Sequence, residues 1–240
     1  MAHSPEMPVR IRRFYKTVSV SPADGGFVIC LDGRGARTPA GRPLRLPTAA
    51  LAELIRAEWA AQGNQIVLHD MLATRLAHTA LDGVADRHDE TVREFARFAD
   101  TDLLCYFAEH PAVLVKREHE TWGPLLDWAR DDLGLAFERT SGVAHRLQPP
   151  EVLAGIVAHA EAVGSFELAG LAFGAARFGS AILILALRAG RINAQETLAA
   201  ARLDEIFQEE HWGVDDEAAS HAARMARETI MLENWFRALG

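Results

Sequence analysis

Histidine and carboxylate side chains are the groups in this chain that could support metal or acid–base chemistry. The chain contains 10 His residues, and His119 is followed by Glu120, as in helices that bind zinc through two histidines. The position one turn later, which would carry the second histidine, holds Gly123, so this zinc motif is absent. We therefore expect no metal site.

The residues that a nucleotide-dependent or covalent enzyme would use are also incomplete. Gly33-Arg34-Gly35 begins like a dinucleotide-binding loop, but the third glycine is missing and the prolines that follow cannot open a helix. A hairpin turn is the simpler interpretation. Ser180 lacks the Gly-x-Ser-x-Gly elbow, and neither Cys30 nor Cys105 has a base nearby in the sequence. We expect no catalytic residue and no cofactor, with both cysteines packed in the core.

Acidic residues are densest between Leu203 and Glu217, a stretch without Lys or Arg. Such a run is usually a solvated face, but Phe207 and Trp212 interrupt it, and aromatic residues among charges are typical of protein-binding hot spots. We therefore predict a docking surface for a partner protein. The alternative is that Asp204 caps or braces neighbouring helices and Trp212 packs between them. The predicted contact residues are Asp204, Glu205, Glu209, Trp212, Gly213, Asp215 and Asp216.

Length and composition describe a folded protein with a sizeable core. The 240 residues are 49% hydrophobic, enough for one large or two modest domains. A net charge of -8 argues against nucleic acid as a partner, and two cysteines indicate a reducing compartment. The most apolar run, Phe178 to Leu187, has 10 residues, whereas a membrane-spanning helix needs roughly 20, so we expect no membrane insertion. Because Phe14 to Val20 resembles a strand and not a transit peptide, we expect a bacterial cytoplasmic protein.

Two regions of different secondary structure should position these residues. In the first 46 residues, short apolar runs alternate with turn signals, which predicts antiparallel hairpins. Thr48 is the expected N-cap of one helix that ends before Gln62. Beyond residue 70 the pattern is helical, and helices are expected at 72–86, 88–99, 111–133, 150–163, 166–189, 194–210 and 215–238.

The predicted fold class is therefore α+β. A small N-terminal antiparallel β domain with one helix should span residues 1–70, followed by a mainly α-helical domain over residues 71–240. Charge changes at the same place, because residues 1–70 contain 9 bases and 6 acids, net +3, and residues 71–240 contain 16 bases and 27 acids, net -11.

A series of short motifs runs along the chain in a fixed order. In the first part they are Arg13-Phe14-Tyr15-Lys16, Leu31-Asp32-Gly33-Arg34, Thr38-Pro39, Glu58-Trp59, Gln62-Gly63 and Thr74-Arg75-Leu76-Ala77. In the second part they are Thr101 to Tyr106, Trp122 to Trp128, Gly179-Ser180, Leu203-Asp204-Glu205 and Trp212-Gly213. Taken in order, these motifs resemble the assembly chaperone family of the F-type ATP synthase that handles the alpha subunit, and the resemblance covers about residues 10–237.

This resemblance implies a non-enzymatic molecular chaperone for ATP synthase assembly, of a family known from mitochondria and alphaproteobacteria. It implies that the protein binds the free alpha subunit, shields its beta-facing interface from aggregation and is displaced by the beta subunit. A lone alpha subunit would expose an obligate apolar interface, which is prone to aggregate until it is paired. The bacterial cytoplasm is the implied location, and the mitochondrial matrix is that of eukaryotic relatives.

One departure and one alternative accompany this interpretation. The family often has an acid after Trp-Gly where this chain has Val214, so Asp215 or Asp216 would have to replace it. The alternative function is a metal-dependent helical enzyme that uses histidine and carboxylate residues. Stoichiometric zinc, manganese or iron that stays bound through dialysis would favour the enzyme.

Overall fold

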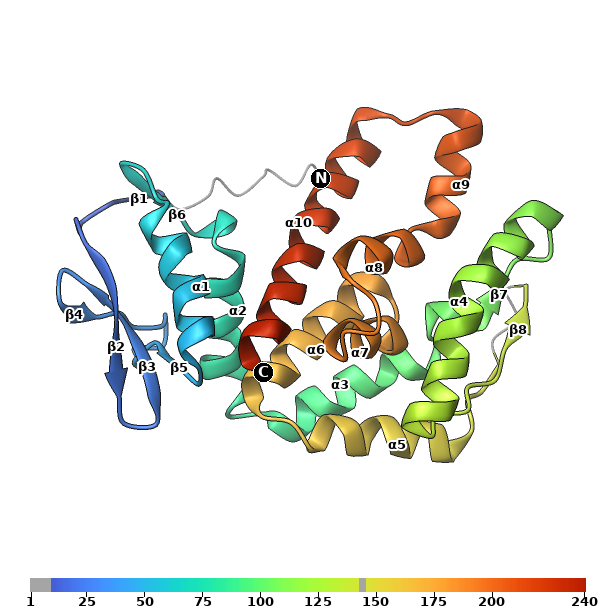
Figure 1. Ribbon diagram of the computed structural model, residues 1–240, viewed down its shortest axis with the longest axis horizontal. Helices are drawn as coiled ribbons and strands as arrows, with labels where there is room; N and C mark the ends of the chain where they lie inside the picture. The colour runs from blue at the N-terminus through green and yellow to red at the C-terminus, as the bar shows by residue number, and fades with distance from the viewer. Residues whose placement is uncertain (1–9, 143–145) are drawn as a thin grey trace, which may run out of the picture. The chain divides into compact units, whose positions relative to one another are not determined.

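The computed structural model describes residues 10–142 and 146–240, and contacts between Cα atoms divide the chain into two compact units. The first unit runs to Asp86 and also includes Asn234–Gly240, and the second unit is Arg87–Glu233. Strands concentrate near the N-terminus and helices follow (Figure 1), which confirms the predicted α+β class. The division differs from the predicted boundary at residue 70, since the helix after that residue and the C-terminal residues group with the β-rich part.

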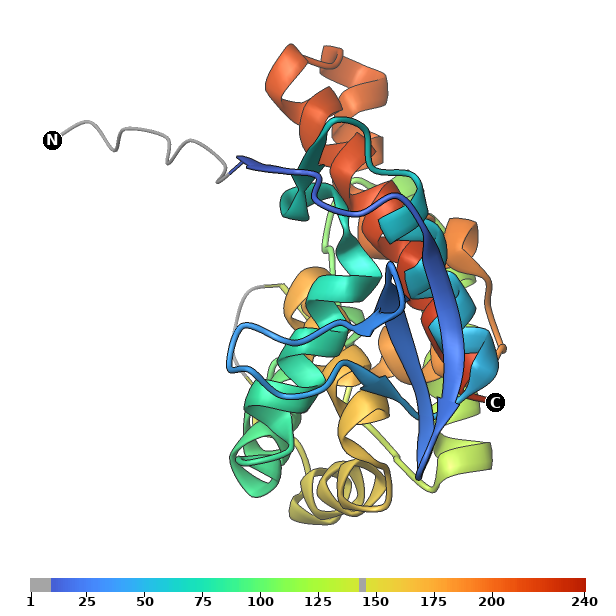
Figure 2. The same ribbon diagram turned by 90° about the vertical axis from the view of Figure 1, so that its left-hand side faces the viewer.

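Antiparallel hairpins form the main sheet of the first unit, as the alternation of apolar runs and turns predicts (Figure 2). Its strands are β2 (Val18–Ala23), β3 (Gly26–Leu31), β4 (Arg34–Gly35) and β5 (Arg45–Leu46). Strand β3 is central because it pairs with each of the other three, and its register places Leu31 opposite Val18 of β2. A separate antiparallel pair joins β1 (Arg10–Arg12) to β6 (Gln65–Val67).

The turn between β3 and β4 lies at Asp32 and Gly33, whose φ angles are 47° and 78°. Two consecutive positive φ values are typical of the two-residue hairpin turn, so this glycine-rich stretch is a hairpin, as predicted. The Asp32 carboxylate accepts hydrogen bonds from the backbone N–H groups of Thr17 (2.8 Å) and Lys16 (3.0 Å), which hold its pKa below the usual value. The strand predicted over residues 14–20 starts only with β2, after these two residues.

Helix α1 (Ala49–Ala60) packs against β2 and β3. Thr48 is its N-cap, as predicted, because the threonine side-chain oxygen accepts a hydrogen bond from the Leu51 N–H at 3.1 Å. The same leucine, Ile55 and Trp59 form the buried face of the helix. Their spacing follows the helical period, which is why the sequence pattern identified this helix.

The first turn of helix α2 (Leu72–Thr79) is hydrogen-bonded to a carboxylate from α1. Glu58 accepts hydrogen bonds from the backbone N–H groups of Ala73 and Thr74, both at 2.8 Å, and so satisfies donors that a helix start leaves unpaired. Burial is the largest influence on this carboxyl and raises its pKa. A single π-helical segment, η2 (Ala80–Val84), continues the chain beyond α2.

Helices build most of the second unit. They are α3 (His88–Asp100), α4 (Ala112–Leu133), α5 (Pro150–Glu161), α6 (Ser165–Phe178), α7 (Ala181–Arg188), α8 (Ala194–Ala201), α9 (Leu203–Trp212) and the larger part of α10 (Asp216–Leu239). A short parallel pair joins β7 (Tyr106–Phe107) to β8 (Thr140–Ser141). Residues 181–187 are all buried, and α7 contacts α3, α4, α6 and α8, so it is the centre of this unit. None of the helices in the described residues is long and apolar enough to span a membrane.

Two of the predicted helices are each divided in the structure. The predicted helix 166–189 ends at Gly179, whose φ is 67°, and restarts at Ser180, whose hydroxyl caps α7. The predicted helix 194–210 is divided at Arg202, whose ψ of 19° departs from helical geometry. The helical spacing of apolar residues continues on both sides of each break. This spacing alone therefore predicted one helix where the structure has two.

The buried carboxylate of Asp102 ties the break at Gly179 and Ser180 to the chain that follows α3. It accepts hydrogen bonds from the Ser180 hydroxyl (2.7 Å) and from the backbone N–H groups of Ile182 (3.0 Å) and Leu104 (3.1 Å). The side chain is fully buried, and this burial raises the pKa to about 6. One carboxylate therefore serves the start of α7 and the turn at Leu104 together.

A close approach between α6 and α7 yields the first prediction. A methyl group added to Gly174 would lie 2.5 Å from Cγ1 of the fully buried Ile184, so Gly174→Ala should lower the free energy of unfolding by about 1–3 kcal/mol. Denaturant unfolding measures this cost.

The double variant Gly174→Ala/Ile184→Ala provides the control for this clash. Truncating the isoleucine alone leaves a cavity, but in the double variant the new methyl group occupies part of that space. We expect the double variant to lose less stability than the two single losses combined. Additive losses would show that the glycine matters for backbone reasons only.

Candidate functional site

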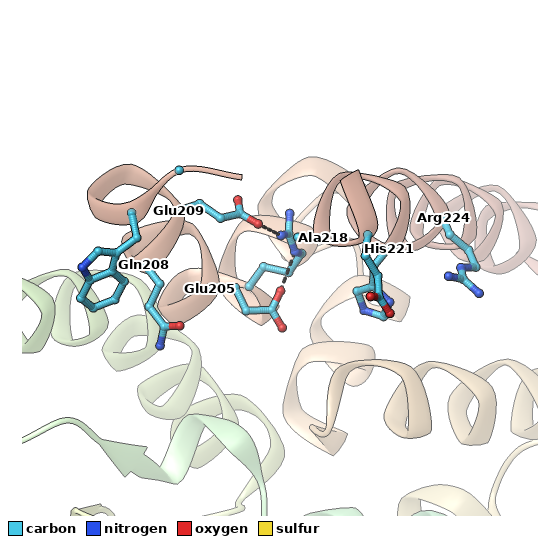
Figure 3. A pocket seen from close by; sticks show the side chains of 10 residues that line it. Glu205, Gln208, Glu209, Ala218, His221 and Arg224 are labelled. Atoms are coloured by element: carbon cyan, nitrogen blue, oxygen red, sulfur yellow. Dashed lines mark hydrogen bonds and ion pairs between the residues drawn. The ribbon is translucent and has the colours of Figure 1, made fainter. Parts of the chain in front are cut away.

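The α9–α10 face, defined by residues 202–224, contains an open pocket of about 440 Å³. The residues that line it are Arg202, Glu205, Gln208, Glu209, Trp212, Gly213, Glu217, Ala218, His221 and Arg224. Four of the seven predicted contact residues are among them. Figure 3 shows Glu205 and Glu209 from α9 on one side of the pocket, and His221 and Arg224 from α10 on the other.

Arg202 neutralises part of the acidic run. It directly precedes the acidic stretch, and its guanidinium pairs with Glu205 at 2.8 Å and with Glu209 at 2.5 Å. The arginine side chain is buried, so the two ion pairs hold α9 to the break that precedes it. Arg117 of α4 pairs with Glu210 at 2.7 Å. Neither arginine lies within residues 203–217, so the composition of that stretch alone did not indicate these partners.

The acids that keep their charge unpaired lie at the start of α10. Among the described residues, Asp215, Asp216 and Glu217 form no salt bridge, and all three are exposed. The Asp215 carboxylate accepts a hydrogen bond from the Ala218 N–H at 2.7 Å and so caps this helix. The negative potential of the face is therefore concentrated at one helix start, where carboxylates also favour the helix dipole.

Two large apolar side chains next to these acids are exposed to solvent. Trp212 is 80% exposed and Val214 is 56% exposed. The exposure of Trp212 contradicts the alternative in which it packs between helices. Gly213 lies between them with φ 86° and ψ 173°, a conformation that essentially only glycine adopts, and this residue separates the end of α9 from the segment that leads to α10. The exposed surface is thus an apolar pair beside three carboxylates.

Asp204 occupies a different environment from the other predicted contact residues. Its Oδ1 atom is buried without a hydrogen-bond donor in the described part of the chain, and the same holds for Oε1 of Glu118 on α4. The other oxygen of Glu118 accepts a hydrogen bond from the Ala108 N–H at 2.7 Å. Burial, followed by the neighbouring Asp204 carboxyl, raises the pKa of Glu118 to about 7. The two side chains meet where α4 contacts α9.

The remaining groups that could do chemistry are used by the fold. Cys30 and Cys105 are buried, as predicted, and burial raises the pKa of the Cys105 thiol. Ser180 accepts the Leu183 N–H at 3.0 Å as the cap of α7. Within residues 10–142 and 146–240, no three histidine, cysteine or acidic side chains are arranged to hold a metal ion.

Comparison with known proteins matches the chain to one family. The family model described as the ATP12 chaperone protein matches residues 12–130. The mitochondrial protein atp12 of Schizosaccharomyces pombe is 26% identical over 230 residues, which are 90% of this chain and 79% of that protein.

Solved structures extend the match over nearly the whole chain. The crystal structure of Atp12 from Paracoccus denitrificans is 38% identical, with a TM-score of 0.90 over 96% of this chain and 99% of that one. The Atu1473 protein of Agrobacterium tumefaciens is 39% identical, with a TM-score of 0.91 over 96% of this chain and 87% of that one.

The raised pKa of Glu118 predicts a pH dependence of stability. A carboxyl whose folded pKa is raised stabilises the fold below its ordinary pKa of 4.5, and this contribution is lost as the pH rises through about 7. Glu118→Gln keeps an amide donor toward Asp204 at every pH. Relative to the native protein, the variant should therefore gain about 1–3 kcal/mol in free energy of unfolding between pH 5 and pH 8.

Urea unfolding at several pH values measures this difference. Asp102 is present in both proteins, so its own titration cancels in the comparison. A difference between native protein and variant that stays constant from pH 5 to pH 8 would show that Glu118 is ionised throughout.

Proposed function

Because the chain belongs to the ATP12 chaperone family, we propose that it assists F-type ATP synthase assembly by binding the free alpha subunit. The chaperone shields the beta-facing interface of that subunit from aggregation and is displaced when the beta subunit arrives. The proposed action is non-covalent and takes place in the bacterial cytoplasm, or in the matrix for mitochondrial relatives. The family membership supports the general role, and the surface chemistry of the second unit supports a protein client.

The observation that carries the proposal is the exposure of Trp212 beside the unpaired acids at the start of α10. A tryptophan that is 80% exposed contributes little to the packing of the core. Its large rigid ring is a frequent anchor at protein interfaces. Val214 extends the apolar area, and the acids at the start of α10 form a charged rim. A client site with an apolar pocket bordered by basic residues would complement this face.

The proposed contact surface is narrower than the run of acids in the sequence. We assign contacts to Trp212, Gly213, Asp215 and Asp216, with Glu205 and Glu209 at the edge of the pocket. Asp204 supports this surface from beneath, because it is half-buried and one of its carboxylate oxygens is buried beside Glu118. Displacement by the beta subunit follows if both proteins cover the same obligate interface of the client, since only one of them can occupy it at a time.

Replacement of the exposed tryptophan tests the contact surface. Trp212→Ala should weaken binding of the alpha subunit by about 2 kcal/mol, roughly thirtyfold, if the indole is buried in the complex. The melting temperature should hardly change, because the side chain is exposed in the free protein. Leu147→Ala is the matched control, since Leu147 is 75% exposed in the same unit. Unchanged affinity of folded Trp212→Ala would remove this surface from the interface.

A competition experiment tests the proposed displacement. Adding purified beta subunit to the preformed chaperone–alpha complex should release free chaperone in proportion to the alpha–beta pairs formed. Analytical size-exclusion chromatography with a labelled chaperone measures this release. A stable complex of all three proteins that contains a full alpha–beta contact would contradict displacement.

A further inference from the structure

The first unit contains a second pocket, of about 520 Å³, that has no residue in common with the α9–α10 face. Its floor consists of apolar side chains that are nearly buried, namely Tyr15, Leu31, Ala36 and Trp59. Phe14 lines the same pocket but is 69% exposed, and its ring contacts Tyr15 edge-on with 5.4 Å between the ring centroids. The fold thus leaves a large aromatic ring in water beside an apolar floor, a composition typical of binding surfaces.

Positive charge borders this pocket. Arg34 and Arg37 line it, and both are exposed. Within the described residues Arg34 forms no ion pair, and Arg37 donates a hydrogen bond only to the carbonyl oxygen of Gly41, at 2.6 Å. The acid that lines the pocket, Asp32, is already bound by backbone N–H groups at the start of β2. The two guanidinium groups therefore remain available to a carboxylate from outside.

Trp59, which lines this pocket, also has an unused hydrogen-bond donor. Its indole nitrogen Nε1 is buried and has no acceptor in the part of the chain that the structure describes. The backbone carbonyl oxygen of the same residue accepts the Tyr15 hydroxyl at 2.8 Å, which holds the Tyr15 ring beside the indole, with 5.7 Å between the ring centroids. A buried donor without a partner is costly, and an acceptor supplied by a ligand would relieve that cost.

We infer that this pocket binds an acidic peptide segment that carries an aromatic or large aliphatic side chain. The apolar side chain packs against Phe14 and Tyr15, and the carboxylates pair with Arg34 and Arg37. That the segment belongs to the alpha subunit rests on the proposed function, whereas the chemistry of the pocket does not. Single-stranded RNA would also offer stacking bases and negative charge, but the chain's net charge of -8 opposes a polyanion and favours a short peptide with few charges.

A peptide titration on the full chain tests the chemistry directly. The probe is fluorescein-labelled Gly-Ser-Phe-Asp-Glu-Phe-Ser-Gly, compared with the same peptide in which Asn and Gln replace the two acids. By fluorescence anisotropy the native protein should bind the acidic peptide about tenfold more tightly than the amide peptide, because each arginine–carboxylate pair is lost in the latter. Phe14→Ala and Arg34→Glu should each weaken binding of the acidic peptide by about tenfold.

Matched variants outside the pocket control for general effects. Ile230→Ala removes another half-exposed apolar side chain, and Arg45→Glu reverses an exposed arginine on β5, so both should bind the peptide as the native protein does. Melting temperatures verify that each variant is folded. If Phe14→Ala fails to fold, Arg34→Glu still decides, because it changes an exposed side chain without an ion pair.

A second titration with free alpha subunit separates this inference from the proposed function. Weaker binding of alpha by both pocket variants supports the inference. If alpha binds all variants equally and the peptides are not distinguished, the pocket inference is wrong while the proposed function stands. If alpha does not bind but the acidic peptide does, through Phe14 and Arg34, the proposed function fails and the pocket remains. Tighter binding of an oligouridylate than of the acidic peptide would overturn the inference in favour of RNA.

Discussion

The carboxylate of Asp102 must be buried, and the second unit is organised around meeting its hydrogen-bonding needs. A buried carboxylate is costly unless donors surround it, and here the Ser180 hydroxyl and two backbone N–H groups point at its oxygens. Those donors come from the start of α7 and from the turn after α3, so the charge can be satisfied only when both segments are in place. Helix α7, whose apolar residues are buried on all sides, is thereby fixed at its N-terminal end.

Carboxylates that accept hydrogen bonds from backbone N–H groups also occur in the first unit. Two of them, Glu58 and Asp32, belong to the family motifs, so those motifs have a structural role. Glu58 binds the first N–H groups of α2, and Asp32 binds the N–H groups that precede β2. Acidic side chains that could otherwise serve acid–base chemistry are thus engaged by the backbone. Each unit also exposes one large aromatic ring beside a pocket, Trp212 in the second unit and Phe14 in the first. The division of labour is consistent with a protein that acts by contact: its polar groups fix the fold and its exposed rings are available to a partner.

The sequence was sufficient for features that depend on local signals. The hairpin at Asp32 and Gly33 and the cap at Thr48 follow from short-range chemistry, and the structure confirms them. Contacts between distant segments could not be predicted in this way. The acidic stretch appeared uncompensated because Arg117 lies on α4, far away in sequence, although Arg202 stood next to it. The exposure of Trp212 could not be predicted from the sequence either, because the same pattern is compatible with a tryptophan packed between helices.

The first unit is completed by the end of the chain. Asn234–Gly240 belong to it, and the Thr48 hydroxyl donates a hydrogen bond to the Ala238 carbonyl oxygen at 2.5 Å. During synthesis, which proceeds from the N-terminus, the β-rich unit therefore lacks part of its own structure until residues 234–240 have been translated. The helical unit, by contrast, is continuous in sequence and can close before those residues are added. Removal of only a few C-terminal residues would consequently destabilise the first unit. The second unit can therefore complete its fold before the first one, although it follows the first unit along the chain.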